Sequence, residues 1–338
     1  MLKNFNSLSE FTAILEQSPK MDTKTFEAAL IRNGQLTKPA GALGRLEEIA
    51  PWYAGWRCEA RPYIDSPQVV IFAGNHGITS QGVSLFPIEV TAQMVSNFKA
   101  GGASINQLSN CFGAKLDVIA LDLETPTHDF TKGAAMSETD FISALKVGWI
   151  SVSESTDLLV VGEMGIGNTT SASAIALALY GGSGTTWAGR GTGLNDKGVK
   201  LKAQVIEAGI AANPLARHNG VQALRCLGGR ELAAMAGAIV RARSLRIPVI
   251  LDGFICCAAA ACLQNISKTA LDHCIAGHKS AEAAHAKLLK MIDKEALLSL
   301  GLRLGEGSGA ALAISILKAA VACHSGMATF SEAGVTET

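Results

Sequence analysis

Glu306 lies between two glycines in residues 301–312, a run otherwise made largely of glycine and apolar residues. Glycine lets a backbone approach a ligand closely, so the carboxylate of Glu306 can point at a bound molecule and accept a proton from it. A helix is expected directly afterwards, where a lone glutamate is commonly a first-turn acid stabilised by the helix dipole. The two interpretations are compatible, because a dipole that keeps the carboxylate ionised also keeps it able to accept a proton.

A glycine-rich loop at residues 162–168 is the second candidate for chemistry. The four residues before it are apolar, which suits a buried parallel strand, and Thr169 and Thr170 are candidate N-caps of a small-residue helix from about Ser171. A strand, a glycine loop and a helix N-terminus together bind anions, phosphate above all. Glu163 would repel a phosphate unless it faces another part of the ligand. An ordinary tight turn is the competing interpretation, since isolated glycine motifs often match by chance.

Basic side chains follow another glycine-rich turn, at residues 189–193. The helix expected after this turn carries Lys197, Lys200 and Lys202 near its start. One lysine in that place can close over a phosphate as a point charge. The alternative is a solvated helix face, and it is favoured for any one of these lysines taken alone.

His76 lies in a polar loop, residues 74–78, directly after a predicted strand at residues 68–73. In open α/β sheets, ligands bind at the carboxyl ends of the strands, where such loops lie. An imidazole there can orient a substrate or take part in acid–base chemistry, because histidine titrates near neutral pH. A histidine that only caps the loop is the alternative.

The elements that must position these residues alternate along the chain as strand, polar loop and helix. This order predicts an α/β fold with a Rossmann-like, doubly wound and mostly parallel sheet whose loops share one rim. One or two amphipathic helices are expected before it, within residues 1–31. Strands are expected at residues 68–73, 115–121, 158–161, 185–188, 248–251 and 275–277.

Composition narrows the class of partner. The 338 residues include 29 Lys plus Arg and 29 Asp plus Glu, so there is no overall charge to attract nucleic acid or an anionic membrane, and a small-molecule partner is favoured. The eight cysteines form no CxxC pair and are expected to be buried thiols. We see no apolar span of 20 residues and no signal peptide, so a cytoplasmic protein is expected.

Several of these stretches carry a family resemblance. Residues 37–47, 73–77, 162–170, 251–254 and 303–311 resemble, in order, the motifs of nicotinate-nucleotide–dimethylbenzimidazole phosphoribosyltransferases, a family of the cobalamin pathway. The resemblance runs from about residue 36 to residue 332. It implies transfer of phosphoribose from nicotinate mononucleotide to 5,6-dimethylbenzimidazole with inversion, giving α-ribazole 5′-phosphate and nicotinate.

The resemblance also implies an organisation and a set of roles. It implies a homodimer without metal or cofactor, with a large domain at residues 36–284 and a small helical domain formed from both chain ends, residues 1–35 and 285–338. Glu306 takes the family's position for the catalytic base. The expected phosphate and ribose contacts are Gly165, Gly167, Asn168, Lys202, Ser280 and Gly307. The expected contacts to nicotinate or benzimidazole are Glu163, His76, Phe86, Met94 and Leu304.

One feature departs from some relatives, which carry serine and glutamine where this chain has Phe86 and Met94. The two apolar side chains predict a preference for methyl over polar ring substituents.

Two rival functions remain open from the residues alone. A dinucleotide-binding oxidoreductase is disfavoured, because residues 162–167 have the order Gly-x-x-Gly-x-Gly and no acidic residue ends a strand about 20 residues later. A non-catalytic nucleotide-binding subunit would bind phosphate without turnover.

Overall fold

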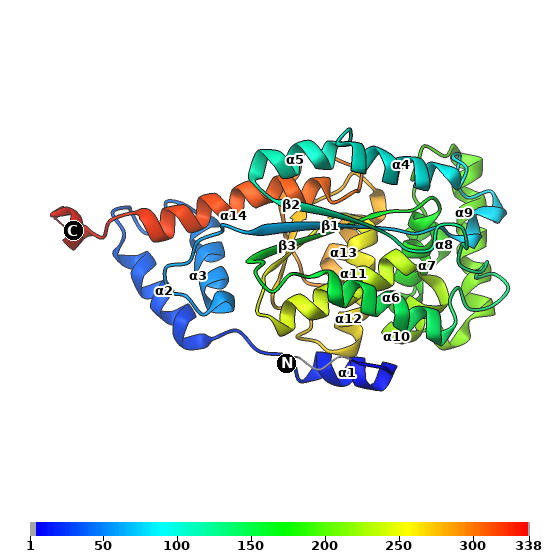
Figure 1. Ribbon diagram of the computed structural model, residues 1–338, viewed down its shortest axis with the longest axis horizontal. Coiled ribbons are helices and arrows are strands. Elements are labelled where there is room, and N and C mark those ends of the chain that lie inside the picture. Colours follow the sequence, from blue (N-terminus) through cyan, green and yellow to red (C-terminus); the bar gives the residue numbers. More distant parts are fainter. Residues whose placement is uncertain (1–4, 337–338) are drawn as a thin grey trace.

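The sheet at the centre of the protein has six strands, all parallel, in the order β2-β1-β3-β4-β5-β6 (Figure 1). This computed structural model describes residues 5–336. The chain leaves β1 for β2 on one side and then returns to β3 on the other, so the connection reverses between β1 and β3. The prediction of a doubly wound parallel sheet is confirmed. The strands are β1 (Pro67–Ala73), β2 (Lys115–Ala120), β3 (Leu158–Met164), β4 (Val249–Leu251), β5 (Cys274–His278) and β6 (Ala296–Leu298).

The central strands are buried on both faces, as apolar runs in a parallel sheet should be. Every residue of β1 is buried, and Leu158 to Val161 of β3 are fully buried. The register pairs Ala73 with Met164 and Val161 with Leu251. The strands therefore end close to one another, and the loops that follow them share one rim.

Helices cover both faces of the sheet (Figure 1). One face carries α6 (Glu138–Ser151), α7 (Asn168–Tyr180), α10 (Gly220–Leu227), α11 (Arg230–Ser244), α12 (Phe254–Ile266) and α13 (Ala283–Met291). The other face carries α3 (Leu46–Arg57), α4 (Glu89–Ala100), α5 (Ser104–Phe112) and α14 (Ser308–Gly326). The remaining elements are α1 (Leu8–Glu16), α2 (Thr23–Gln35), η1 (Gly77–Gln81), α8 (Gly184–Trp187), α9 (Asp196–Ala212), η2 (Pro214–Ala216) and α15 (Phe330–Ala333).

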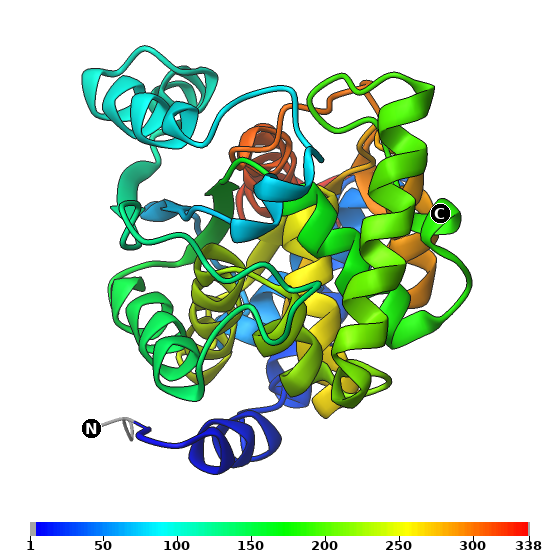
Figure 2. The same ribbon diagram turned by 90° about the vertical axis from the view of Figure 1, so that its right-hand side faces the viewer.

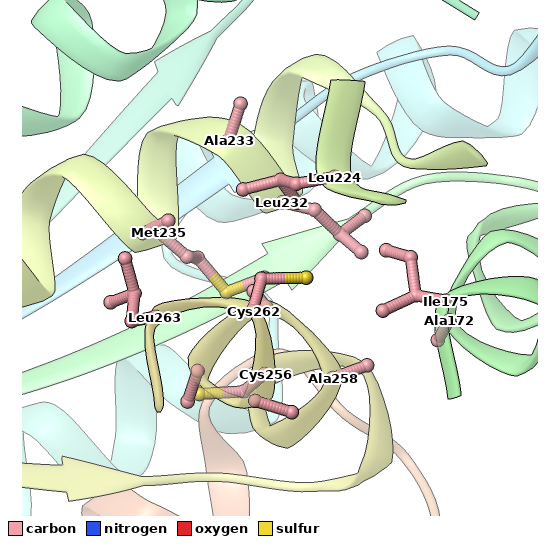
Figure 3. Close-up of a cluster of buried hydrophobic side chains, with 14 of the residues drawn as sticks. Ala172, Ile175, Leu224, Leu232, Ala233, Met235, Cys256, Ala258, Cys262 and Leu263 are labelled. Atoms are coloured by element: carbon pink, nitrogen blue, oxygen red, sulfur yellow. The ribbon is translucent and has the colours of Figure 1, made fainter. Parts of the chain in front are cut away.

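Small side chains let these helices pack closely around α12 (Figure 3). Cys256, Ala258 and Cys262 of α12 belong to one continuous apolar cluster with Ile175 of α7 and Met235 of α11. The expectation that the cysteines are buried thiols holds for five of the eight, at 226, 256, 257, 262 and 274; Cys58 and Cys111 are exposed and Cys323 is partly exposed. Burial raises the pKa of the five buried thiols, so they are inert packing groups.

Helix α14 runs away from the sheet, and α2 and α3 lie beside its far end (Figure 1). Arg32 of α2 donates hydrogen bonds to the carbonyls of His324 (3.1 Å) and Met327 (2.7 Å). Leu36 and Thr329 form an isolated antiparallel bridge.

The ranges predicted for a small helical domain also contain elements that belong with the sheet. β6 is the edge strand of the sheet, although it falls within residues 285–338. Helix α1 packs on the face of the sheet that carries α6 and α11. Phe11 and Leu15 belong to the apolar cluster on this face, and Phe5 packs edge-on against Trp149.

Local predictions failed at two places. The strand expected at residues 185–188 is the short helix α8, because Ser183 and Thr186 form a capping box that favours a helical turn. α7 begins at Asn168 with Gly167 as its N-cap, so neither Thr169 nor Thr170 caps it. The elements α6, α10, α11 and β6 had no counterpart among the predictions.

By length and composition alone, α14 is the one helix of residues 5–336 able to cross a membrane, with a mean hydropathy of 1.4. In this fold 56% of the apolar stretch of α14 is buried inside the protein. α14 packs against α3, α5 and β5, which is the usual setting of an apolar core helix.

Candidate active site

A cavity of about 400 Å³ lies at the carboxyl ends of β3, β4 and β5, next to the loop before α14. Figure 2 looks onto this end of the molecule, with α4 at the upper left and α9 at the right. Eight of the twelve residues predicted for the site line the cavity: Phe86, Met94, Glu163, Gly165, Asn168, Ser280, Leu304 and Glu306. The structure thus brings both predicted carboxyl groups, from loops far apart in the sequence, into one cavity.

The loop that carries Glu306 has an unusual backbone. Gly305, Glu306 and Gly307 have φ values of 81°, 59° and 71°, three consecutive residues in the left-handed region. A non-glycine residue held there costs energy and persists only where its surroundings impose it, typically at functional sites. Gly162 of β3 permits the arrangement, since a Cβ at this position would lie 2.6 Å from the backbone nitrogen of Gly307 and 2.9 Å from the carbonyl carbon of Glu306.

The carboxyl groups of the cavity have different proton affinities because their surroundings differ. Burial, and then the nearby negative charge of Asp252, raises the pKa of Glu306 to about 7. Burial together with the charges of Asp252, Glu231 and Glu306 raises the pKa of Glu163 to about 8. Glu163 therefore holds its proton more strongly than Glu306, and both carboxyl groups titrate near neutral pH. A carboxylate with a pKa near the working pH is well suited to general base catalysis.

Glu163 is tied to the two loops of the site. Its carboxyl group accepts a hydrogen bond from the side-chain amide of Asn168, at the start of α7. On the other side it lies against Gly305, where a Cβ would be 2.5 Å from Oε1. Glu163 therefore does not have to repel a phosphate bound at the glycine-rich loop. Its raised pKa favours the neutral form, and it faces the loop that carries Glu306.

The N-terminus of α7 opens into the cavity. Asn168 and Thr169 of its first turn line the cavity, and Gly167 precedes them as N-cap with a φ of 96°. The preceding loop is held by Thr91, whose Oγ1 accepts a hydrogen bond from the N–H of Ile166 (3.2 Å). Backbone donors and the positive end of the helix dipole favour a phosphate in this place. Ser280, at the rim after β5, lies in the same cavity.

Lys202 is buried, so the interpretation of a solvated lysine is wrong for this residue. Its side chain is 1% exposed, whereas Lys197 and Lys200 of the same helix are exposed. The Nζ atom donates a hydrogen bond to Oγ1 of Thr169 (2.7 Å) and lies 3.5 Å from the carbonyl oxygen of Gly189. Burial lowers the pKa of Lys202 to about 8. Lys202 does not line the cavity itself but touches Thr169, which does.

Part of the cavity wall is apolar. Phe86, Val90 and Met94, from the loop before α4 and from α4 itself, line the cavity together with Leu304. Phe86 and Leu304 are 50% and 58% exposed, so this wall is open to solvent when nothing is bound. An aromatic, uncharged ring fits such a wall.

Three residues predicted to contact substrate lie behind the cavity wall. Gly167 and Gly307 are the N-caps of α7 and α14 and shape the two loops. His76 is 1% exposed, and both of its ring nitrogens contact protein groups, Glu231 Oε1 and Ser171 Oγ. The structure therefore places His76 beneath the glycine loop, because its ring fills the space under Gly165.

Sequence reasoning missed Glu231, Thr169 and Arg303 as part of the site. Arg303 and Thr169 line the cavity, and Glu231 is fully buried under the loop. The position of Thr169 beside the glycine loop was a usable signal, because first-turn hydroxyls commonly contact anions. No group of three or more His, Cys, Asp or Glu side chains in the described part of the chain is arranged to hold a metal ion.

Comparison with known proteins shows the family to which the chain belongs. A sequence model of a phosphoribosyltransferase family matches residues 18–335. The chain is accordingly a phosphoribosyltransferase, an enzyme of the pentosyltransferase class.

The relatives define the family more closely. The nicotinate-nucleotide–dimethylbenzimidazole phosphoribosyltransferase of Ruegeria sp. (strain TM1040) is 61% identical over 337 residues, covering 100% of both chains, and that of Novosphingobium aromaticivorans is 53% identical over 336 residues, covering 99% of both. The crystal structure of CobT from Thermus thermophilus is 35% identical, covers 93% of this chain and 100% of its own, and has a TM-score of 0.86. The chain belongs to the nicotinate-nucleotide–dimethylbenzimidazole phosphoribosyltransferase family.

Proposed function

We propose that the enzyme transfers the 5-phosphoribosyl group of nicotinate mononucleotide to 5,6-dimethylbenzimidazole, with inversion, to give α-ribazole 5′-phosphate and nicotinate for the lower ligand of cobalamin. The names of the relatives support the two substrates. The observation that carries the proposal is that Glu306, with a pKa near neutrality, shares one cavity with an anion site and an apolar wall.

The substrates are assigned to the cavity by their chemistry. The 5′-phosphate takes the N-terminus of α7, with the cation of Lys202 behind Thr169 and with Ser280 opposite. The aromatic ring of the base takes the wall formed by Phe86, Met94 and Leu304. The ribose then lies between them, in front of Glu163 and Glu306, and phosphate binding holds it in register for reaction.

The reaction exchanges one C–N bond for another. A ring nitrogen of the benzimidazole attacks C1′ of the ribose while the bond from C1′ to the pyridine nitrogen of nicotinate breaks. The bonding electron pair goes to that pyridine nitrogen, which thereby loses its positive charge, so nicotinate is a good leaving group. The transition state resembles an oxocarbenium ion, as in glycoside hydrolysis, and inversion requires the two bases on opposite faces of the sugar.

Glu306 accepts the remaining proton. Attack by one benzimidazole nitrogen leaves an acidic N–H on the other, and the carboxylate of Glu306 takes this proton. A neutral benzimidazole is already a fair nucleophile, so we expect the ordinary contribution of a general base, about 10²–10⁴-fold in rate.

The enzyme acts on two small molecules, and the reaction needs no nucleic acid, membrane, metal or cofactor. A homodimer in the cytoplasm is the state that the family resemblance implies, and sedimentation of the purified protein tests the dimer.

The test is incubation with nicotinate mononucleotide and a panel of benzimidazoles, with the products identified by mass. We expect nicotinate and α-ribazole 5′-phosphate in equal amounts, and a Glu306→Gln variant that folds normally and loses most turnover. Glu295→Gln is the matched control, because this glutamate has an 84% exposed side chain and does not line the cavity. Phosphate binding without nicotinate release from the wild type would contradict the proposal and favour a non-catalytic binding protein.

A further inference from the structure

The ends of β4 and β5 hold the first turn of α14. Oδ1 of Asp252, directly after β4, accepts a hydrogen bond from the N–H of Ala310 (2.9 Å). At the end of β5, a Cβ on Gly277 would lie 2.8 Å from the Cα of Ala310. The ring of His278 is pressed so closely on the helix that a Cβ on Gly309 would overlap it. The first turn of α14 is therefore packed closely on the ends of β4 and β5 and hydrogen-bonded to Asp252.

The same turn fixes the backbone of Glu306. α14 begins at Ser308, only two residues later, with Gly307 as its N-cap. Three consecutive left-handed residues do not hold their conformation by themselves, because each has a lower-energy alternative or an entropic cost. A clamp on the first turn of α14 is therefore needed to keep the carboxylate of Glu306 in the cavity.

Asp252 and His278 form an unusual pair. Each is 2% exposed, and Nε2 of His278 lies 3.5 Å from Oδ1 of Asp252. Among residues 5–336, neither ring nitrogen of His278 has a hydrogen-bond partner of good geometry. His278 also lines the substrate cavity. Buried polar groups are nearly always satisfied, and exceptions concentrate where a group serves a function.

We propose that Asp252 and His278 are positioning residues for Glu306: they clamp the turn that carries it, and Asp252 places a fixed negative charge behind it. The inference rests on the proposed role of Glu306 as the proton acceptor. It goes beyond that role because the clamp and the fixed charge act on Glu306 and not on the substrate.

The charged groups around Glu306 are consistent with this division of tasks. Glu163 faces it from β3, Glu282 and Arg303 share the cavity, and His278 lies beside Asp252. Burial alone would raise the pKa of Asp252, but the imidazole of His278 and the N–H of Ala310 hold it below its ordinary value. Asp252 thus stays ionised while the carboxyl groups of Glu163 and Glu306 titrate near neutrality.

The decisive variant is Asp252→Asn, because asparagine keeps an oxygen that can accept the N–H of Ala310 and removes only the charge. Loss of a neighbouring negative charge lowers the pKa of Glu306, so the acidic limb of the kcat profile should move to lower pH by roughly one unit. The plateau should fall as well, because Glu306 becomes a weaker base. KM for nicotinate mononucleotide should stay within about twofold, since the anion site is unchanged.

The matched control is Asp157→Asn. This aspartate also accepts backbone N–H groups, from Asp65 (2.6 Å) and Ser66 (2.8 Å), but at the opposite end of the sheet. Its kcat profile should coincide with that of the wild type. All variants are compared by kcat at saturating substrate. The substrates titrate in the same way in every assay, so a difference between two profiles comes from the enzyme.

His278→Gln supplies a second test that does not depend on how well Asp252→Asn folds. Loss of the ring loosens the clamp, so kcat should fall by roughly tenfold or more with little change in KM. Wild-type kcat in this variant, or an acidic limb that Asp252→Asn leaves in place, overturns the inference. A wild type without an acidic limb, or a fully active Glu306→Gln variant, instead contradicts the proposed function.

Discussion

The imidazole of His76 and the carboxylate of Glu231 meet beneath the glycine loop of the active site, with Nε2 and Oε1 2.5 Å apart. The second ring nitrogen, Nδ1, lies 3.0 Å from the hydroxyl of Ser171 on α7. A Cβ on Gly165 would lie 3.3 Å from both Nε2 of His76 and Oε1 of Glu231, and a Cβ on Gly229 would overlap the ring. The His76–Glu231 pair thus supports the glycine-rich loop at residues 162–168 and leaves no room for a side chain at Gly165 or Gly229.

Glu231→Ala should destabilise the protein by about 1–3 kcal/mol, because it leaves a buried ring nitrogen of His76 without its hydrogen-bond partner. The affinity for nicotinate mononucleotide should fall too, since the loop loses its support. Urea unfolding and calorimetric binding measure the two effects. Glu231→Gln should be milder than Glu231→Ala, because an amide can still bond to the ring.

The matched control is Glu154→Gln. Glu154 pairs with Arg241 but has a 76% exposed side chain, and exposed pairs contribute only about 0–1 kcal/mol. If Glu231→Ala changed stability no more than this control, the supporting role of the pair would be refuted.

The rim of the site could be predicted from the sequence because its signals are local. Apolar runs such as residues 158–161 mark buried strands, and the polar loop after each one must lie at the carboxyl edge of a parallel sheet. The glycines around Glu306 likewise indicate a close backbone approach. These rules placed Glu163 at the carboxyl edge of the sheet, and the family resemblance placed Glu306 in the same site.

The residues that support the site from behind could not be predicted, because their roles depend on contacts between segments that are distant in the sequence. Glu231 has the sequence setting of any first-turn acid on a helix, and only the packing of α11 under the glycine loop makes it a partner of His76. Lys202 differs from Lys197 and Lys200 only by pointing inward from α9. The short helix α8 was mistaken for a strand because threonine and tryptophan favour strands, whereas its capping box decided otherwise.

Gly162→Ala should reduce activity far more than its size suggests. The new methyl group would lie 2.5 Å from Cδ1 of Ile71 and 2.6 Å from the backbone nitrogen of Gly307, so the Glu306 loop must shift. A displacement of a catalytic group by about 1 Å can cost 10²-fold in rate. Steady-state kinetics together with a crystal structure of the variant measure both changes.

Gly34→Ala serves as the reference substitution for Gly162→Ala. Gly34 lies in α2 and a Cβ there meets nothing within 4 Å, so this change should leave activity intact and stabilise the helix by about 0.5–1 kcal/mol. Equal activity in the two variants would show that β3 and the Glu306 loop do not need this close contact.

The apolar wall predicts which bases are accepted. Phe86 and Met94 offer no partner to a ring hydroxyl, and leaving such a group unpaired costs about 1–3 kcal/mol. Because Phe86 is half exposed, we expect the lower end of this range, about a fivefold to tenfold preference for dimethylbenzimidazole over a hydroxybenzimidazole. Met94→Gln should reduce the ratio of kcat/KM for dimethylbenzimidazole to kcat/KM for the hydroxybenzimidazole. A wild type that prefers hydroxybenzimidazoles or phenols would contradict this account.

Lys202→Met should stabilise the ligand-free protein while weakening its binding of phosphate. Burial lowers the pKa of Lys202 from 10.5 to about 8, which corresponds to a cost of about 3 kcal/mol for keeping the buried lysine charged at pH 7. Methionine removes this cost, although it also loses the hydrogen bond to Thr169. The melting temperature without ligand should therefore rise, and the further rise on adding nicotinate mononucleotide should largely disappear.

The pH dependence of stability gives an independent check on Lys202. Because its folded-state pKa lies below its unfolded-state pKa, the unfolded chain binds more protons between about pH 8 and pH 10.5, so this lysine makes the wild type more stable as pH rises through that window. Lys202→Met should lack this increment, whereas Lys200→Met, on the exposed face of the same helix, should retain it. Urea titrations at pH 7, 8, 9 and 10 compare the three proteins. If Lys202→Met and wild type kept a constant difference in unfolding free energy over this range, Lys202 would carry its charge without penalty, and the trade-off between stability and phosphate binding would not exist.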